Sequence, residues 1–150
     1  MEIIFTLNGR AVTVTAQPME ILTDVLRQRL GMTSVKKGCE TGDCGACAVL
    51  VDGQLVNSCI TLAATVSGKS VTTVEGLMVN GDLDIIQQRL AEYHGTQCGF
   101  CTPGMVLAIK ALLNENLQPS EVEIREALAG NLCRCTGYQK IVAAVQSITV

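Results

Sequence analysis

The chain has 150 residues and a formal net charge of -3, with 17% charged and 48% apolar residues. The small acidic excess argues against a nucleic-acid partner, because surfaces that bind nucleic acid are rich in Lys and Arg. The apolar runs are shorter than the roughly 18 residues of a membrane span, and the N-terminus lacks the basic and apolar segments of an export signal. We therefore expect a cytoplasmic protein whose low charge leaves apolar surface for a protein partner.

A hairpin followed by a helix is predicted at the start of the chain. Apolar residues alternate over residues 3–7 and 12–14, and Asn8-Gly9 between them is a two-residue hairpin signal. Residues 20–30 then place their apolar side chains on one helical face. Gly31 follows them, and glycine is favoured just past the end of a helix.

Three more strands complete the predicted sheet. They cover residues 48–51, 54–59 and 71–74. The first two flank Asp52-Gly53, which is a second hairpin signal. A sheet with one helix packed on it is an α+β arrangement, and we expect this domain to cover residues 1–76.

The chain has eight cysteines, of which Cys39, Cys44, Cys47 and Cys59 lie in this first domain. The cytosol keeps thiols reduced, so metal ligands are favoured over disulfides. The spacing of these four is typical of plant-type ferredoxins, which hold a [2Fe-2S] cluster. Glycines between them let the backbone pass close to a cluster and turn N–H groups toward its sulfurs. Zinc is the alternative, but zinc sites usually take their ligands as two short pairs.

The second half of the chain is predicted to be helical. Apolar residues repeat with helical spacing over residues 83–93, 103–113, 120–128 and 138–148. Ser120 and Glu123 have the spacing of a capping box, and Thr102-Pro103 is typical of an N-cap followed by proline. We expect an all-α four-helix bundle domain over residues 82–150, after a connector near residues 75–81.

The other four cysteines form two close pairs, Cys98 with Cys101 and Cys133 with Cys135. Two predicted helices separate the pairs, so the four thiols can converge only through tertiary folding. Cys133 and Cys135 would point to nearly opposite sides of a helix, and we therefore place both in a turn after Gly130. Nearby helix N-termini would face an anionic cluster. On spacing alone, a site for a single zinc or iron ion remains an alternative.

Three segments resemble the iron–sulfur subunits of the molybdenum hydroxylase family, which is typified by xanthine dehydrogenase. They are KKGCETGDCGACAVLVDGQLVNSC, GTQCGFCTPGM and GNLCRCTGY. The first segment alone is also similar to simple ferredoxins, whereas the other two match a helical second-cluster domain that simple ferredoxins do not have. The resemblance extends over about residues 3–148 and includes all eight cysteines in order.

The resemblance implies a β-grasp, plant-type ferredoxin-like domain followed by a helical domain, with one [2Fe-2S] cluster in each. It implies a non-catalytic electron-transfer subunit of a hetero-oligomeric oxidoreductase. The expected partners are a large subunit that binds a molybdopterin cofactor and a medium subunit that binds FAD, with electrons passing from the first to the second. Gln97 and Cys135 would lie against the molybdopterin cofactor of the large subunit.

The chain lacks the sequence signatures of a catalytic site. It has no nucleotide-binding glycine loop, no nucleophile elbow and no carboxylates placed with a histidine for acid–base chemistry. We expect the other cofactors on separate polypeptides and, within the family, a complex that acts on an aromatic N-heterocycle such as a purine or pyridine. The alternative function is a free-standing iron–sulfur carrier or redox sensor that binds a regulator.

A few residues near the cysteines allow two interpretations. Gln97 is either a cofactor contact or an ordinary exposed glutamine, and Phe100 either shields a cluster or only packs. His94 is the single histidine, and we expect an ordinary residue at a helix end because Rieske sites need two histidines. Lys36 and Lys37 either offset cluster charge or form a solvated pair.

Overall fold

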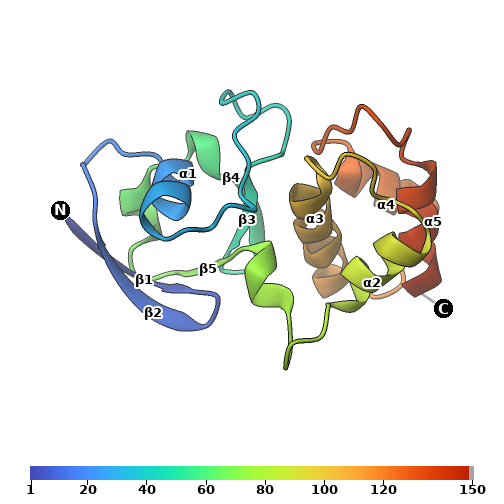
Figure 1. Cartoon of the computed structure of the whole chain (residues 1–150), viewed down its shortest axis with the longest axis horizontal. Helices are drawn as coiled ribbons and strands as arrows, with labels where there is room; N and C mark the ends of the chain where they lie inside the picture. The colour runs from blue at the N-terminus through green and yellow to red at the C-terminus, as the bar shows by residue number, and fades with distance from the viewer. Residues whose placement is uncertain (149–150) are drawn as a thin grey trace.

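The computed structural model describes residues 1–148 and contains a sheet-rich unit beside a helical unit (Figure 1). The sheet has the strand order β2-β1-β5-β3-β4. The strands β1 and β5 are parallel, and the other neighbouring pairs are antiparallel. The strands are β1 (Glu2–Leu7), β2 (Arg10–Thr15), β3 (Ala48–Val51), β4 (Gln54–Asn57) and β5 (Ser70–Thr72).

The predicted helix of the first half lies on this sheet, but its second half is wound differently. A short α1 (Leu22–Asp24) continues into a π-helical turn, η1 (Val25–Arg29), where the N–H of Leu30 reaches the carbonyl of Val25 over 3.2 Å. Leu22, Val25 and Leu26 are fully buried in a core shared with the strands. The apolar stripe thus determines which face is buried, while the helix winding was not predictable from it.

Short 3-10 turns account for the remaining differences in the sheet unit. The strand predicted at residues 54–59 ends at Asn57, because Cys59 lies in the turn η2 (Ser58–Ile60). Two further turns, η3 (Ala63–Val66) and η4 (Val74–Leu77), flank β5. The α+β assignment is confirmed, with strand ends moved by two residues or fewer in β4 and β5.

Four α-helices form the second unit, as predicted. They are α2 (Ile85–Glu92), α3 (Thr102–Glu115), α4 (Glu121–Leu128) and α5 (Gln139–Ile148). The capping box of Ser120 and Glu123 is present. The prediction that Thr102 caps α3 is wrong, because the carbonyl of Cys101 already accepts the first helical hydrogen bond, and Cys101 is the N-cap. Leu83 lies before α2 and is 48% exposed.

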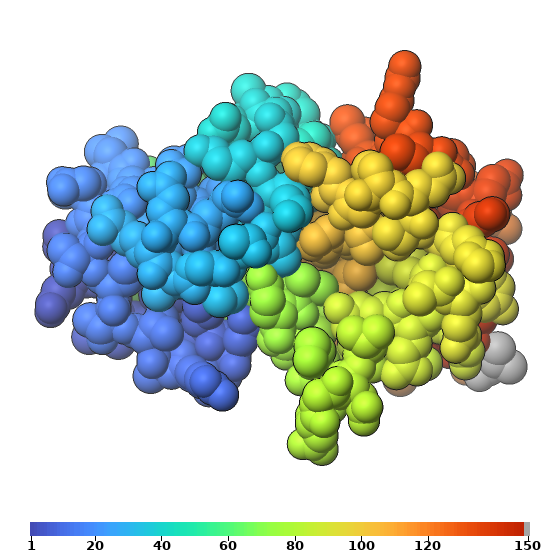
Figure 2. Space-filling view, in the orientation of Figure 1, coloured from blue at the N-terminus to red at the C-terminus, as the bar shows by residue number. Residues whose placement is uncertain are grey.

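The strand β3 joins the two hydrophobic cores. Val49 and Val51 point into the core of the sheet unit, whereas Leu50 belongs to the core of the helical unit. Every residue of β3 is buried, which explains its continuous apolar run. The helix α3 packs against β3 and β4, so the two units contact each other directly. The connector around residues 78–82 protrudes at the lower edge of Figure 2.

No helix within residues 1–148 combines the length and apolar character needed to cross a membrane. The last two residues of the predicted 82–150 domain lie outside the described part of the chain.

Candidate iron–sulfur sites

The loop between η1 and β3 folds around the first two cysteine sulfurs. Cys39 Sγ accepts hydrogen bonds from the backbone N–H groups of Thr41 (3.4 Å), Asp43 (3.3 Å) and Cys44 (3.3 Å). Cys44 Sγ accepts from the N–H groups of Cys39 (3.4 Å) and Ala46 (3.5 Å). Donors that converge on a sulfur stabilise its thiolate, and they also favour the reduced form of a bound cluster.

The other two cysteines of the first group lie deeper in the sheet unit. Cys47 and Cys59 are 2% and 5% exposed, and the N–H of Cys59 donates to Cys47 Sγ over 3.5 Å. Burial, together with the neighbouring Cys47, raises the pKa of Cys59 to about 11. The Cys59 thiol therefore keeps its proton unless a cation displaces it, which is the behaviour expected of a metal ligand.

Two glycines make the close approach in this loop possible. A Cβ at Gly38 would lie 2.7 Å from Cys44 Sγ. Gly45 has a φ of +74°, and a Cβ there would collide with the carbonyl oxygen of Gly130 in the helical unit. The loop therefore needs glycine both to hold its sulfurs and to contact the second unit.

The exposed end of the loop already favours a thiolate. Hydrogen bonds from the Thr41 side chain and from the N–H groups of Thr41, Cys44 and Asp43 lower the pKa of Cys39 to about 5. The Thr41 hydroxyl also donates to Asp43 Oδ2 over 2.6 Å. Because a hydroxyl has one proton and this bond is short, we attribute the effect on Cys39 mainly to the backbone donors.

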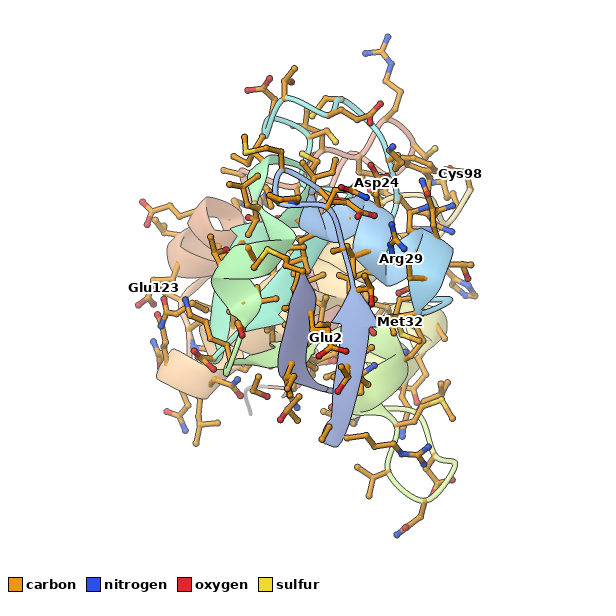
Figure 3. All side chains as sticks on the ribbon, turned by 90° about the vertical axis from the view of Figure 1, so that its left-hand side faces the viewer. Glu2, Asp24, Arg29, Met32, Cys98 and Glu123 are labelled. Atoms are coloured by element: carbon orange, nitrogen blue, oxygen red, sulfur yellow. The ribbon has the colours of Figure 1, made fainter. Side chains whose placement is uncertain are left out.

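The second group of cysteines lies in two loops of the helical unit. Cys98 and Cys101 precede α3, while Cys133 and Cys135 lie between α4 and α5, as the sequence predicts. The thiol of Cys101 is hydrogen-bonded to that of Cys133. Burial is the main cause that raises the pKa of Cys101, to about 12, and the neighbouring Cys133 is the second. Cys98 pairs with Cys135 and raises its pKa through a side-chain hydrogen bond. Cys98 and Cys135 are exposed, and Figure 3 places Cys98 toward the upper end of the molecule.

Cys133 differs from its partner because a nearby threonine donates to it. Burial opposes ionisation of Cys133, but hydrogen bonds from the side chain and N–H of Thr136, from the N–H of Cys135 and from the Cys101 thiol together lower its pKa. The Thr136 hydroxyl lies 3.0 Å from Cys133 Sγ, and the Thr136 N–H lies 3.4 Å from it. The N–H of Cys133 itself donates to the Tyr138 hydroxyl over 2.9 Å.

Residues of both cysteine groups line one cavity at the junction of the units. Its volume is about 270 Å³. The loops that carry the cysteines also bond directly, because the N–H of Leu132 donates to the carbonyl of Cys44 over 2.9 Å. The amide of Asn131, which is 3% exposed, donates to the carbonyl of Gly45 over 3.1 Å. The cysteines that line the cavity are Cys39, Cys44, Cys98, Cys101, Cys133 and Cys135.

The arrangement of the thiols fits two-iron clusters better than single ions. Within residues 1–148, no three side chains of His, Cys, Asp or Glu are placed to hold one metal ion. The cysteines instead approach each other in pairs, such as Cys47 with Cys59 and Cys101 with Cys133. Single-ion zinc sites need four ligands around one point, whereas a [2Fe-2S] cluster takes two thiolates on each iron. The donor set therefore fits [2Fe-2S] chemistry at both sites.

Other residues singled out in the sequence lie around these loops. Gln97 is exposed beside Cys98. Phe100 is 48% exposed, and its ring lies 3.7 Å from the position of a Cβ at Gly38, so it spans the two cysteine loops. His94 is an exposed residue in the turn after α2, as expected. Lys37 contacts Asp24 (2.9 Å) and a second carboxylate, so its charge is already paired.

Sequence reasoning missed three residues that organise the second site, Asn131, Thr136 and Tyr138. The Tyr138 hydroxyl accepts from Cys133 N and donates to the carbonyl of Asn131 over 2.9 Å. Their positions inside the GNLCRCTGY segment were the available signal, since hydroxyl and amide groups next to ligands commonly orient them. The positive φ of Tyr138, +67°, had no signal in the sequence.

Comparisons with known proteins agree with this arrangement. Residues 5–74 match a family described as a 2Fe-2S iron-sulfur cluster binding domain, and residues 73–146 match a [2Fe-2S] binding domain. The chain is 51% identical over 133 residues to a probable xanthine dehydrogenase subunit of Bacillus subtilis, and the match covers 89% of this chain and 76% of the relative. It is 47% identical over 140 residues to the nicotinate dehydrogenase small FeS subunit of Eubacterium barkeri, and that match covers 93% and 89%.

A solved structure is similar over nearly the whole chain. A chain of quinoline 2-oxidoreductase from Pseudomonas putida 86 superposes with a TM-score of 0.96 at 44% identity, over 99% of this chain and 92% of that chain. The sheet-then-helices order, the two cysteine sets and these matches lead to one assignment. The chain belongs to the iron–sulfur electron-transfer subunits of the xanthine dehydrogenase and aldehyde oxidoreductase family.

Proposed function

We propose that the chain relays electrons from a molybdopterin cofactor on a large subunit to FAD on a medium subunit. The observation that carries this proposal is the junction, where both cysteine groups line one cavity. The hydrogen bond from Leu132 N–H to the Cys44 carbonyl adds a short route between ligand-bearing segments, because Leu132 directly precedes Cys133. A [2Fe-2S] cluster, when bound, supplies one-electron chemistry.

Each cysteine group is proposed to hold one cluster. Residues 1–76 would form the domain of the first site, and residues 82–150 that of the second. The backbone donors around Cys39 and Cys44 support the first assignment, and the two thiol pairs of the helical unit support the second. The proposed ligands are Cys39, Cys44, Cys47 and Cys59 for the first cluster, and Cys98, Cys101, Cys133 and Cys135 for the second.

The unequal exposure of the sites supports an order for the relay. Cys98 and Cys135 are exposed, as is Gln97, so another subunit can reach the second site. We assign this surface to the large subunit, with Gln97 and Cys135 against the molybdopterin cofactor. Ile60, which is 62% exposed and covers Gly42, would belong to the side that faces the flavin subunit.

The chain's own residues would bind, orient and shield the clusters. The half-exposed Phe100 lies between the loops and would exclude water from the junction. Apolar side chains that are exposed in the connector region, Met78, Val79 and Leu83, would be covered in the complex, because the chain alone leaves them in water. A cytoplasmic location agrees with eight free thiols.

For the substrate, we propose an aromatic N-heterocycle. Relatives of this chain are named after such compounds, namely nicotinate, nicotine and quinoline. Substrate contacts would belong to the large subunit, since the described part of this chain carries no acid–base site of its own.

Purification of the assembled complex with candidate substrates tests this function. Under anaerobic conditions, an N-heterocycle should reduce both clusters and then the flavin. Gln97→Ala should slow turnover about tenfold or more and leave the iron content unchanged, because it removes a contact with the molybdopterin cofactor rather than a ligand. Gln54→Ala, an exposed position in β4, is the matched control and should leave turnover unchanged. Purification of the chain without larger subunits, or equal activity of both variants, would contradict the proposal.

A further inference from the structure

Thr136 stands between a proposed cluster ligand and the start of α5. Its hydroxyl oxygen lies 3.0 Å from Cys133 Sγ, and its backbone N–H lies 3.4 Å from the same sulfur. Thr136 and Cys133 are both partly buried. The geometry makes Thr136 a side-chain donor to a sulfur at the second site.

The neighbouring backbone decides where the hydroxyl proton points. The N–H of Tyr138 donates to Thr136 Oγ1 over 3.2 Å, so the oxygen already accepts one hydrogen bond. A threonine hydroxyl has a single proton, and Cys133 Sγ is the acceptor at 3.0 Å. The hydroxyl therefore donates to the sulfur.

The first site has a threonine at a similar place but uses it differently. The Thr41 hydroxyl donates to Asp43 Oδ2 over 2.6 Å. The sulfurs of Cys39 and Cys44 receive backbone N–H groups, which a side-chain substitution does not remove. Thr41 is therefore a matched control for Thr136.

We propose that Thr136 is a positioning and tuning residue that raises the reduction potential of the second cluster through its hydrogen bond to Cys133. A donor to a ligand sulfur stabilises the additional negative charge of the reduced cluster more than it stabilises the oxidised cluster. The hydroxyl thus makes the second cluster easier to reduce than it would otherwise be. This inference rests on the proposed function, in which Cys133 is a ligand.

Redox titration of the cluster-loaded complex, followed by paramagnetic resonance, tests this role. Thr136→Val keeps the shape of the side chain but removes the donor. At a fixed applied potential, the ratio of reduced to oxidised second cluster should fall about tenfold, which corresponds to about 59 mV for a one-electron couple. The first cluster should keep its midpoint.

Two further variants separate tuning from a purely structural role. Thr136→Ser keeps the hydroxyl and should hold the reduced-to-oxidised ratio within about twofold of the unaltered chain. Thr41→Val should leave the second cluster unchanged. An unchanged second-cluster midpoint in Thr136→Val would overturn the proposal. An equal fall of the reduced-to-oxidised ratio in Thr136→Val and Thr136→Ser would also overturn it, as would loss of the second cluster from Thr136→Val. Either result would mean that Thr136 only maintains the structure of the loop.

Iron and sulfide analysis of the unaltered chain keeps this test apart from the proposed function. About four irons and four sulfides per chain, with an unchanged midpoint potential of the second cluster in Thr136→Val, would contradict the tuning role but not the relay proposal. About two irons per chain would mean that one proposed cluster is missing, and the relay proposal would fail with it.

Discussion

The two cysteine groups solve the same chemical problem with different structures. The first group is held mainly by one tight loop whose backbone N–H groups point at the sulfurs, and its Cys47 and Cys59 are buried in the core of the sheet unit. The second group comes from loops at the ends of separate helices, and its Cys98 and Cys135 remain exposed. The first site keeps its hydrogen-bond donors when side chains are substituted, because the donors are backbone N–H groups. The second site depends on side chains such as Thr136 and on a partner subunit to cover its exposed cysteines.

The largest effect is expected from removing one ligand at each site. Cys101→Ser should abolish the second cluster and about half of the iron, while the first cluster is retained, because none of its four proposed ligands is changed. Cys44→Ser should do the reverse, and it preserves the Cys44 carbonyl that bonds Leu132. Iron analysis and paramagnetic resonance of the reduced chain measure both. Loss of both signals from either variant would show that the sites form one cooperative unit.

Disrupting the contact between the two units should lower the free energy of unfolding while all eight cysteines are kept. Gly45→Ala combines a φ of +74° with a collision against the Gly130 carbonyl, and we expect it to lower the free energy of unfolding by about 3 kcal/mol. Gly53→Ala has a similar φ of +81° but open space around it, and should cost about 1 kcal/mol. Urea unfolding compares the two. Equal costs would mean that the contact with Gly130 is unimportant.

The buried amide at the junction should have a smaller effect. Asn131→Ala removes one of the two donors to the Gly45 carbonyl, which also accepts from the N–H of Ala48 over 3.1 Å. We expect a loss of about 1.5 kcal/mol, together with changed spectra of both clusters. Asn57→Ala removes a comparable bond, to the Gly42 carbonyl over 2.9 Å, but within the sheet unit. Asn57→Ala should therefore change only the spectrum of the first cluster. If Asn131→Ala changed the spectrum of only one cluster, the proposal that the junction links both sites would be contradicted.

The smallest effect is expected at Tyr138. Tyr138→Phe keeps the ring and removes the hydroxyl that bonds Cys133 N and the Asn131 carbonyl. Because Cys133 is partly exposed and water can replace the hydroxyl beside its N–H, thermal unfolding should reveal a loss of only about 1 kcal/mol. The second cluster should show a modest spectral change, and the first none. A change at the first cluster as large as at the second would contradict this local role.

Alternation, helical stripes and cysteine spacing predicted most of the fold. They identified both hairpins, four helices and the turn that holds Cys133 and Cys135, because these patterns record burial and local geometry. They failed where winding or capping depends on tertiary contacts, as in the π-helical turn after α1 and at Cys101. The bond from Leu132 to Cys44 and the shared cavity join segments far apart in the chain, and no local pattern could indicate them.

Two separate [2Fe-2S] clusters, one on each cysteine group, underlie the relay and the predictions above. Metal and sulfide analysis of the complex, combined with paramagnetic resonance after stepwise reduction, detects them without any substitution. We expect about four irons and about four sulfides per molecule of this chain, and two distinguishable signals that appear at different potentials. About two irons with a single signal, or zinc in stoichiometric amount, would contradict the assignment of two clusters.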